Sequence, residues 1–220
     1  MKTVYKLTVV VMSFTLLASA HASLIKIETG FSAARQQADA AAYKSLVNTA
    51  IASPSAGYGT TFVTSYDNIS NRNLFLSGSK TDIAFKSTID FYVSPENAGS
   101  WQFRIGVDFG HGGAIFVDDV AYDFKTNNMW WNGSYKNSSQ YLSINSLNLA
   151  TGNHTLNLYG LEGCCDGYQQ AQFRVGNGDF TTFSTSDNLT LIPEPKIYTL
   201  MLAGLGLIWC TAYRRKESIT

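Results

Sequence analysis

The sequence contains few cysteines, histidines and charged residues. Its 220 residues include three cysteines, three histidines and four prolines, and charged residues make up 15% of the chain. Gly-x-Ser-x-Gly motifs, phosphate-binding glycine loops and Cys-x-x-Cys pairs are all missing, so the common signatures of serine hydrolases, nucleotide-binding proteins and thiol oxidoreductases are lacking. We therefore expect no enzymatic activity. The remaining catalytic alternative is a glycosidase with two facing carboxylates, which needs no such motif.

Basic residues are also sparse in the middle of the chain. Residues 23–192 contain 10 lysine and arginine residues and 14 aspartate and glutamate residues, a net charge of −4. Nucleic acids and anionic membranes are bound by clustered basic side chains. We therefore expect neither as a partner of this region.

The two ends of the chain are apolar. Residues 1–22 have the order of a secretory signal peptide: a positive start, an apolar stretch, and small residues at a cleavage site before Ser23. Residues 197–213 form an apolar run near the short limit for a transmembrane helix. Arg214 and Arg215 follow at once, and basic flanks stay on the cytoplasmic side. The sequence predicts an exported protein with a C-terminal transmembrane helix.

A short motif precedes this apolar run. Pro193, Glu194 and Pro195, the apolar segment and the arginine pair follow one another within residues 193–216. This order resembles the PEP-CTERM sorting signal. The resemblance implies that an exosortase cuts near the motif, that the protein is only transiently anchored in the cytoplasmic membrane, and that the product reaches the cell surface or an extracellular polysaccharide matrix. A permanent membrane anchor is the alternative.

The region between the two ends is long enough for one domain with its own core. Its first part is rich in helix formers and predicts one helix over residues 32–50. Beyond it, apolar residues alternate with polar ones, which is typical of half-buried antiparallel strands. The residues expected to share faces are Ile83, Phe85, Ile89, Phe91 and Val93, and then Trp101, Phe103, Ile105 and Val107. The sequence therefore predicts a mainly β protein, an antiparallel β-sandwich with one N-terminal helix.

The order of particular residues in this region matches a known pattern. These are Trp101, Phe103, Asp108, Gly110, Gly113, Val117, Asp118, Gly152, His154 and Tyr159. Residues 78–183 thereby resemble the protective-antigen type of β-sandwich, which is shared by bacterial glycosidases, toxins and fungal adhesins. The resemblance implies a non-catalytic domain. Outside it, we expect the helix and first strands in residues 23–77 and a linker in residues 184–192. The Cys-Cys-x-Gly element resembles that of a group of PEP-CTERM proteins.

The resemblance to fungal adhesins implies a calcium site at Asp118 and Asp119. In those adhesins, two consecutive aspartates joined by a cis peptide hold Ca²⁺, which binds sugar hydroxyls. Ca²⁺ takes six to eight oxygen ligands, and Asp108, Asp123 and the acidic loop at Asp166 are the candidates for further ones. The alternative is that Asp118 closes a turn and Asp119 is solvated.

Two adjacent tryptophans are a candidate sugar-binding feature. Trp130 and Trp131 cannot both enter one core from a regular strand, because successive side chains point to opposite faces. An exposed indole can stack on a sugar ring. The alternative is that both rings pack under a loop.

Cys164 and Cys165 are adjacent, and the third cysteine, Cys210, lies in the apolar C-terminal run. An exported protein meets an oxidising environment. The pair either forms a disulfide with each other, joins other chains, or stays free. A disulfide between neighbours would give a rigid loop tip that shapes a ligand site together with Asp166.

These observations predict a non-catalytic carbohydrate-binding module that binds extracellular polysaccharide, with Ca²⁺ as a cofactor. The alternative is a structural matrix protein without a small ligand, crosslinked through its cysteines.

Overall fold

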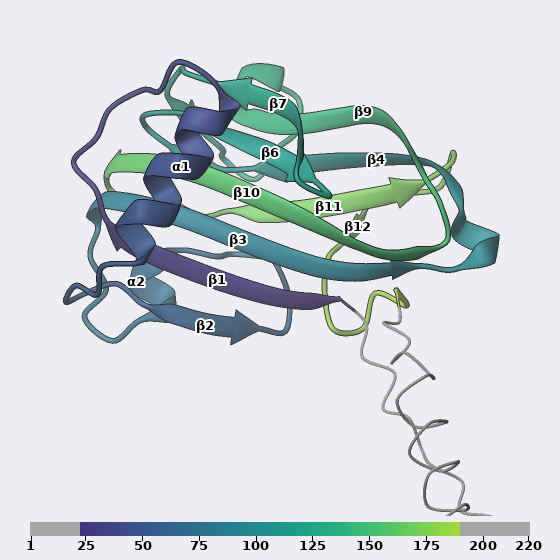
Figure 1. The fold of residues 1–220 in the computed structure, drawn as a ribbon, viewed down its shortest axis with the longest axis horizontal. Coiled ribbons are helices and arrows are strands. Elements are labelled where there is room, and N and C mark those ends of the chain that lie inside the picture. The colour runs from purple at the N-terminus through teal and green to yellow at the C-terminus, as the bar shows by residue number, and fades with distance from the viewer. Residues whose placement is uncertain (1–22, 190–220) are drawn as a thin grey trace, which may run out of the picture.

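The computed structural model describes residues 23–189, which fold into two facing β-sheets with one long helix on the outside (Figure 1). The larger sheet has six strands in the order β2-β1-β3-β10-β6-β7, and all its neighbouring strands are antiparallel. Its strands are β1 (Leu24–Phe31), β2 (Thr60–Val63), β3 (Thr81–Val93), β6 (Gly113–Val117), β7 (Val120–Lys125) and β10 (Gly152–Cys164).

The second sheet has four strands in the order β12-β11-β4-β9, and a two-stranded sheet pairs β5 with β8. The bounds are β4 (Gly99–Gly106), β5 (Asp108–Phe109), β8 (Met129–Trp130), β9 (Tyr141–Leu149), β11 (Gln170–Val175) and β12 (Thr181–Thr182). Short helices occupy Asn71–Leu74 (α2), Pro95–Asn97 and Ser138–Gln140. The prediction of a mainly β, antiparallel sandwich is confirmed.

The main core lies between the two large sheets. Side chains that alternate along β3 and β4 fill it, because every second residue of a strand points to the same side. All nine residues that the sequence places on these two faces are buried there. Phe91 of β3 lies 5.5 Å from Trp101 of β4, measured between ring centroids. The alternation in the sequence therefore identified the inner faces of both sheets.

The long helix, α1 (Ala40–Ile51), packs on the outer face of the six-stranded sheet, where Figure 1 shows it crossing β10 and β3. Tyr43 and Val47 are fully buried against this face. The predicted start at residue 32 was wrong, because residues 32–39 are not helical. The Asp39 side chain caps the helix by accepting a hydrogen bond from the Ala42 N–H at 2.8 Å. Helix formers upstream of this cap lie outside the helix.

The N-terminal segment and the described part of the expected linker both belong to the sandwich. Strand β1 lies between β2 and β3, so residues 23–77 share the sheet of residues 78–183. Asp187 accepts a hydrogen bond from the Ser23 hydroxyl at 2.7 Å, and Leu189 is buried in the main core. Residues 184–189 thus close the domain.

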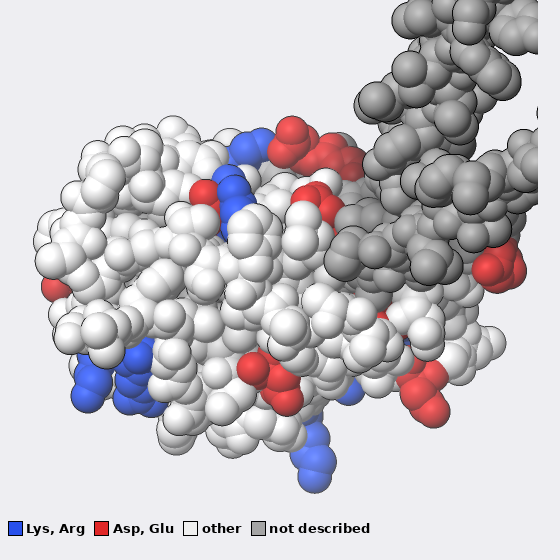
Figure 2. Space-filling model, turned by 90° about the horizontal axis from the view of Figure 1, so that it is seen from below, with Lys and Arg blue, Asp and Glu red and all other residues white. Residues whose placement is uncertain are grey.

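Within residues 23–189, no helix is long and apolar enough to cross a membrane. The predicted signal peptide, Cys210, the Pro193–Pro195 motif and the predicted transmembrane helix lie outside the described residues. Figure 2 shows one face of the domain, on which Lys, Arg, Asp and Glu occur in small separate groups with wide uncharged areas between them.

Candidate functional site

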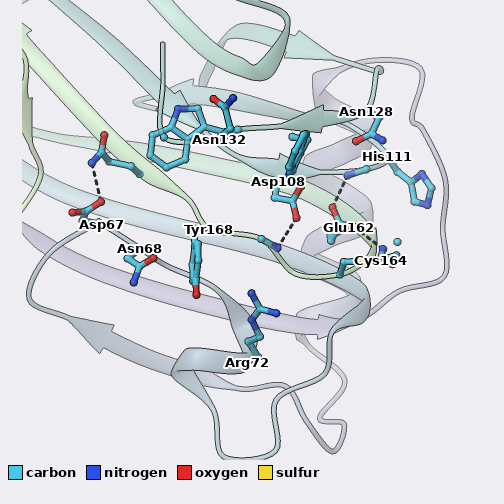
Figure 3. Close-up of a pocket in the computed structure, with 18 of the residues that line it drawn as sticks. Asp67, Asn68, Arg72, Asp108, His111, Asn128, Asn132, Glu162, Cys164 and Tyr168 are labelled. Atoms are coloured by element: carbon cyan, nitrogen blue, oxygen red, sulfur yellow. Dashed lines mark hydrogen bonds between the residues drawn. A yellow bond between two sulfur atoms is a disulfide. The ribbon is translucent and has the colours of Figure 1, made fainter. Parts of the chain in front are cut away.

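A large cavity of about 1170 Å³ opens at the end of the sandwich where β10 runs into its disulfide loop. Five segments that are distant in the sequence line it (Figure 3). They are the segment before α1 with Arg35; the loop before α2 with Asp67 and Asn68, together with Arg72 of α2; the β5 region with Asp108, Gly110 and His111; the β8 region with Asn128 and residues 130–133; and the segment around the disulfide with residues 162–165, Gly167, Tyr168 and Gln170.

The adjacent cysteines form a disulfide with each other. The Cys164 and Cys165 sulfurs are 2.07 Å apart and the two Cα atoms 3.7 Å apart. Cys165 has a φ of 94° and Asp166 a φ of 52°, so the chain turns sharply after the strand. Of the three states that the sequence left open, the structure has the bond between neighbours. Both cysteines line the cavity.

Two buried carboxylates hold the loops around this disulfide. Glu162 accepts hydrogen bonds from the Gly110 N–H at 2.6 Å and from the Cys164 N–H at 2.5 Å. Asp108 accepts one from the Gly167 N–H. A Cβ at Gly167 would lie 2.4 Å from an Asp108 oxygen, so glycine is needed for this close approach. The two carboxylates therefore connect the β5 region to the disulfide loop.

Asp166 has the same role on the other side of the loop. Its carboxylate accepts hydrogen bonds from the Asn71 N–H at 2.9 Å and the Arg72 N–H at 2.6 Å. Its side chain is buried, and Asp166 is not among the residues that line the cavity. The sequence placed it in the ligand site, but its oxygens are engaged by the backbone of α2. Asp166 thus fixes the cavity wall.

The buried position of these carboxylates changes their acidity. Burial raises the pKa of Glu162 to about 7, and the neighbouring charge of Asp108 adds to the effect, while the Gly110 N–H opposes it. Burial also raises the pKa of Asp108, against the hydrogen bond from Gly167. The pKa of Asp166 is raised for the same reason, against the hydrogen bonds from Arg72 and Asn71.

The two tryptophans have different surroundings. The Trp130 side chain is 67% exposed, whereas Trp131 is 8% exposed. The Trp131 ring covers Gly106, where an added Cβ would lie 2.4 Å from the ring, and its centroid is 5.5 Å from that of Tyr135. Sequence alternation predicted this separation, and both residues line the cavity. Trp130 offers a free ring face and Trp131 forms part of the wall.

A second exposed aromatic ring lies in the cavity. Tyr168 follows the disulfide loop and is 43% exposed. The guanidinium carbon of Arg72 is 5.5 Å from its ring centroid, and Figure 3 shows Arg72 directed toward Tyr168. The side-chain amide of Gln170, which also lines the cavity, donates a hydrogen bond to the Asp67 carboxylate at 2.8 Å. Sequence reasoning missed Tyr168 and Arg72, because no local pattern joins residue 72 to residue 168.

The three aspartates predicted to bind calcium do not come together. Asp118 and Asp119 form the turn between β6 and β7, with φ values of 49° and 65°. The Asp118 carboxylate accepts from the Thr155 N–H at 2.9 Å and lies 2.7 Å from His154 Nδ1, and Asp119 pairs with Lys44 at 2.9 Å. Asp108 instead lies beside the far end of β10.

The separation follows from the length of β10. Thr155 and Glu162 are seven residues apart on this strand, or roughly 23 Å at about 3.3 Å per residue. Residues 23–189 contain no cis peptide bond and no group of three or more His, Cys, Asp or Glu side chains placed to hold a metal ion. Asp108, Asp118 and Asp119 therefore do not fit one shared calcium site, and calcium binding stays a prediction.

No protein-family model matches the sequence, and the comparison with curated proteins gives no match. Several solved structures are similar. The PA14 domain of the antifreeze protein MpAFP is 11% identical, with 74% of this chain and 89% of that chain covered and a TM-score of 0.51. A PA14 sugar-binding domain from an RTX adhesin is 14% identical, with 74% and 96% covered and a TM-score of 0.48. The epithelial adhesin 9 A domain from Candida glabrata, in complex with Galb1-4GlcNAc, is 10% identical, with 77% and 92% covered and a TM-score of 0.43. At these identities the likeness concerns the fold alone. The similarity to the MpAFP domain shows that this chain folds as a sandwich like that of a PA14 domain.

Proposed function

We propose that this protein is a non-catalytic carbohydrate-binding module of the cell surface or of an extracellular polysaccharide. The observation that carries the proposal is the open cavity in which the exposed rings of Trp130 and Tyr168 accompany side-chain amides. Sugar rings have apolar faces and polar edges, so a site for them combines aromatic surfaces with hydrogen-bonding groups. The cavity offers both.

The polar side chains of the cavity suit hydroxyl groups. Asn68, Asn128 and Asn132 are exposed and line the cavity, and each carboxamide both donates and accepts hydrogen bonds. A sugar hydroxyl likewise does both. These amides therefore match a polyhydroxylated ligand better than a purely apolar one.

The buried carboxylates favour binding over glycoside hydrolysis. Glu162 has the raised pKa of a general acid. However, its two oxygens each accept a hydrogen bond from a backbone N–H, and its side chain is buried. A glycosidase needs two carboxyl groups facing the scissile bond. Glu162 is engaged in holding the loop, so we expect no turnover of polysaccharides.

The proposal includes the path to the cell surface. Residues 1–22 act as a signal peptide, and residues 193–216 act as a PEP-CTERM tail that anchors the protein transiently until an exosortase cuts it. The mass of the mature protein tests this: we expect loss of both segments. A mature protein that retains residues 197–213 would instead be permanently anchored.

The alternative of a matrix protein crosslinked through cysteines has less support. Crosslinking requires free sulfurs, and Cys164 and Cys165 are bonded to each other. Non-reducing electrophoresis of the exported protein separates the two functions, because crosslinking gives a disulfide ladder and the carbohydrate-binding module gives a monomer.

The binding experiment uses the full chain and a panel of polysaccharides. We expect Trp130→Ala and Tyr168→Ala each to weaken binding about tenfold, because each removes a stacking surface worth roughly 1 kcal/mol or more. Tyr122→Ala is the matched control, since Tyr122 is 42% exposed, nearly as much as Tyr168 at 43%, but lies on β7 outside the cavity. Repeating the measurement with a chelator tests the calcium prediction separately. If no polysaccharide binds, the proposed function is wrong.

A further inference from the structure

Two arginines line the cavity without a carboxylate partner. Arg35 and Arg72 are both lining residues, and neither takes part in any ion pair formed within residues 23–189. Arg35 Nη1 lies 2.8 Å from His111 Nε2, and the Arg72 guanidinium lies over the Tyr168 ring. The cavity therefore contains two permanent positive charges whose hydrogen-bond donors are largely unused.

The acidic side chains that line the cavity already accept hydrogen bonds from other groups of the protein. Asp108 and Glu162 are buried and accept hydrogen bonds from backbone N–H groups. Asp67 is exposed, and its carboxylate accepts from the Gln170 amide. The two guanidinium groups are the charged groups of the cavity that can still donate hydrogen bonds to a ligand. A ligand with a negative charge can use them.

The position of Arg72 is fixed by the surrounding structure. Its backbone N–H donates to the buried Asp166 carboxylate at 2.6 Å. The adjacent Asn71 side chain is buried and donates to the Gly57 carbonyl at 2.8 Å and the Ser79 carbonyl at 2.9 Å. With Tyr168 against the guanidinium, both ends of Arg72 are supported. A preorganised guanidinium loses less entropy when it binds a carboxylate.

We propose that the cavity binds an acidic polysaccharide and that Arg72 holds the carboxylate of a uronic acid residue. A guanidinium binds a carboxylate with two parallel hydrogen bonds, which gives orientation as well as affinity. The aromatic rings hold the sugar ring, and Arg35 supplies a second positive charge for the polymer. This inference rests on the proposed carbohydrate-binding function and narrows its ligand to one class.

The test compares oligogalacturonate with its methyl ester, which keeps the sugar ring and its other hydroxyls but removes the charge. With the full chain at about 0.15 M salt, we expect the acid to bind about tenfold more tightly, as one charge-assisted contact allows. Arg72→Gln is expected to remove most of the preference for the acid, with the remainder due to Arg35, and to leave binding of the ester unchanged. Arg72→Lys is expected to restore only part of the preference, because an ammonium lacks the planar pair of donors.

Lys136→Gln is the matched control, since it removes one positive charge from an exposed side chain outside the cavity lining. It is expected to leave the preference for the acid intact. Thermal unfolding of each variant confirms that it is folded. Equal binding of acid and ester by the unaltered chain, or a preference that is undiminished in Arg72→Gln, overturns this inference alone. If neither of these ligands nor any neutral polysaccharide binds, the proposed function fails, and the inference with it.

Discussion

The two ends of strand β10 both have aspartates beside them, but these side chains differ in their surroundings. At the start of the strand, the Asp118 and Asp119 side chains are 47% and 77% exposed and form contacts with other side chains and one backbone N–H. At its end, Asp108 and Asp166 are buried and accept hydrogen bonds from the backbone of neighbouring loops. Buried carboxylates hold loops in place, and these loops then present other side chains to solvent.

This difference accompanies the position of the cavity, which lies at the disulfide end of the strand. The hairpin turn at Asp118 and Asp119 contacts β10 and α1 through half-exposed or exposed carboxylates. The disulfide loop, through Glu162, Asp108 and Asp166, connects the β5 region and α2. The two ends thus differ in the burial of the carboxylates that hold their loops, not in the number of segments that those carboxylates reach.

Removal of the Asp166 carboxylate is expected to have the largest effect on stability. Asp166→Ala leaves two buried backbone N–H groups without their charged acceptor, and we expect the free energy of unfolding to fall by about 4 kcal/mol. Asp118→Ala at the other end is expected to cost about 1 kcal/mol, because water replaces a half-exposed side chain. Denaturation with urea measures both. Equal losses at the two ends would contradict the assigned roles.

The acidity of Glu162 gives a second test, with a defined sign. Its pKa is raised in the folded state from 4.5 to about 7, so between these values the folded chain binds a proton that the unfolded chain has released. The free energy of unfolding therefore decreases as the pH rises from about 4.5 to about 7, by up to about 3 kcal/mol from this group.

Glu162→Gln is expected to flatten this part of the pH profile, whatever it does to stability at one pH. Denaturation measured at several pH values between 4 and 8 gives the slope for both chains. Asp119→Asn at the exposed end serves as the control and should leave the slope unchanged. A steep decrease that survives in the Glu162→Gln chain would assign the effect to another group.

The smallest expected effects concern two glycines near the tryptophans. Gly106→Ala places a Cβ 2.4 Å from the Trp131 ring, and we expect a loss of about 2 kcal/mol and a shift in tryptophan fluorescence as the ring moves. Gly133→Ala meets no atom within 4 Å but has a φ of +83°, so about 1 kcal/mol of backbone strain is expected, with little change in fluorescence. A larger loss of stability in Gly133→Ala than in Gly106→Ala would mean that Trp131 is not packed as described.

Local patterns predicted those parts of the structure that depend on neighbouring residues. Alternation along β3 and β4 gave the core faces, since a strand repeats every two residues. The same alternation of side chains along a strand predicted that Trp130 and Trp131 have different surroundings. The resemblance to the adhesins directed attention to Asp118 and Asp119, but the trans turn there and the length of β10 keep them away from Asp108.

The rest of the site depends on long-range pairing, which a single sequence does not reveal. Arg72 meets Tyr168 because Ile69 pairs with Gln169 in an isolated antiparallel bridge. The role of Asp166 depends on the same bridge, because its hydrogen bonds go to residues 71 and 72. Arg72 and Tyr168, which are central to the proposed ligand, are therefore residues that sequence patterns could not assign.

The bridge between Ile69 and Gln169 also has a consequence for folding. It joins segments a hundred residues apart, and contacts of such long range form late because the chain between them must first be ordered. The cavity can therefore form only after nearly the whole domain has been synthesised and has folded. We expect an incomplete chain ending before β11 to lack the cavity, so the presence of the cavity depends on completion of the fold.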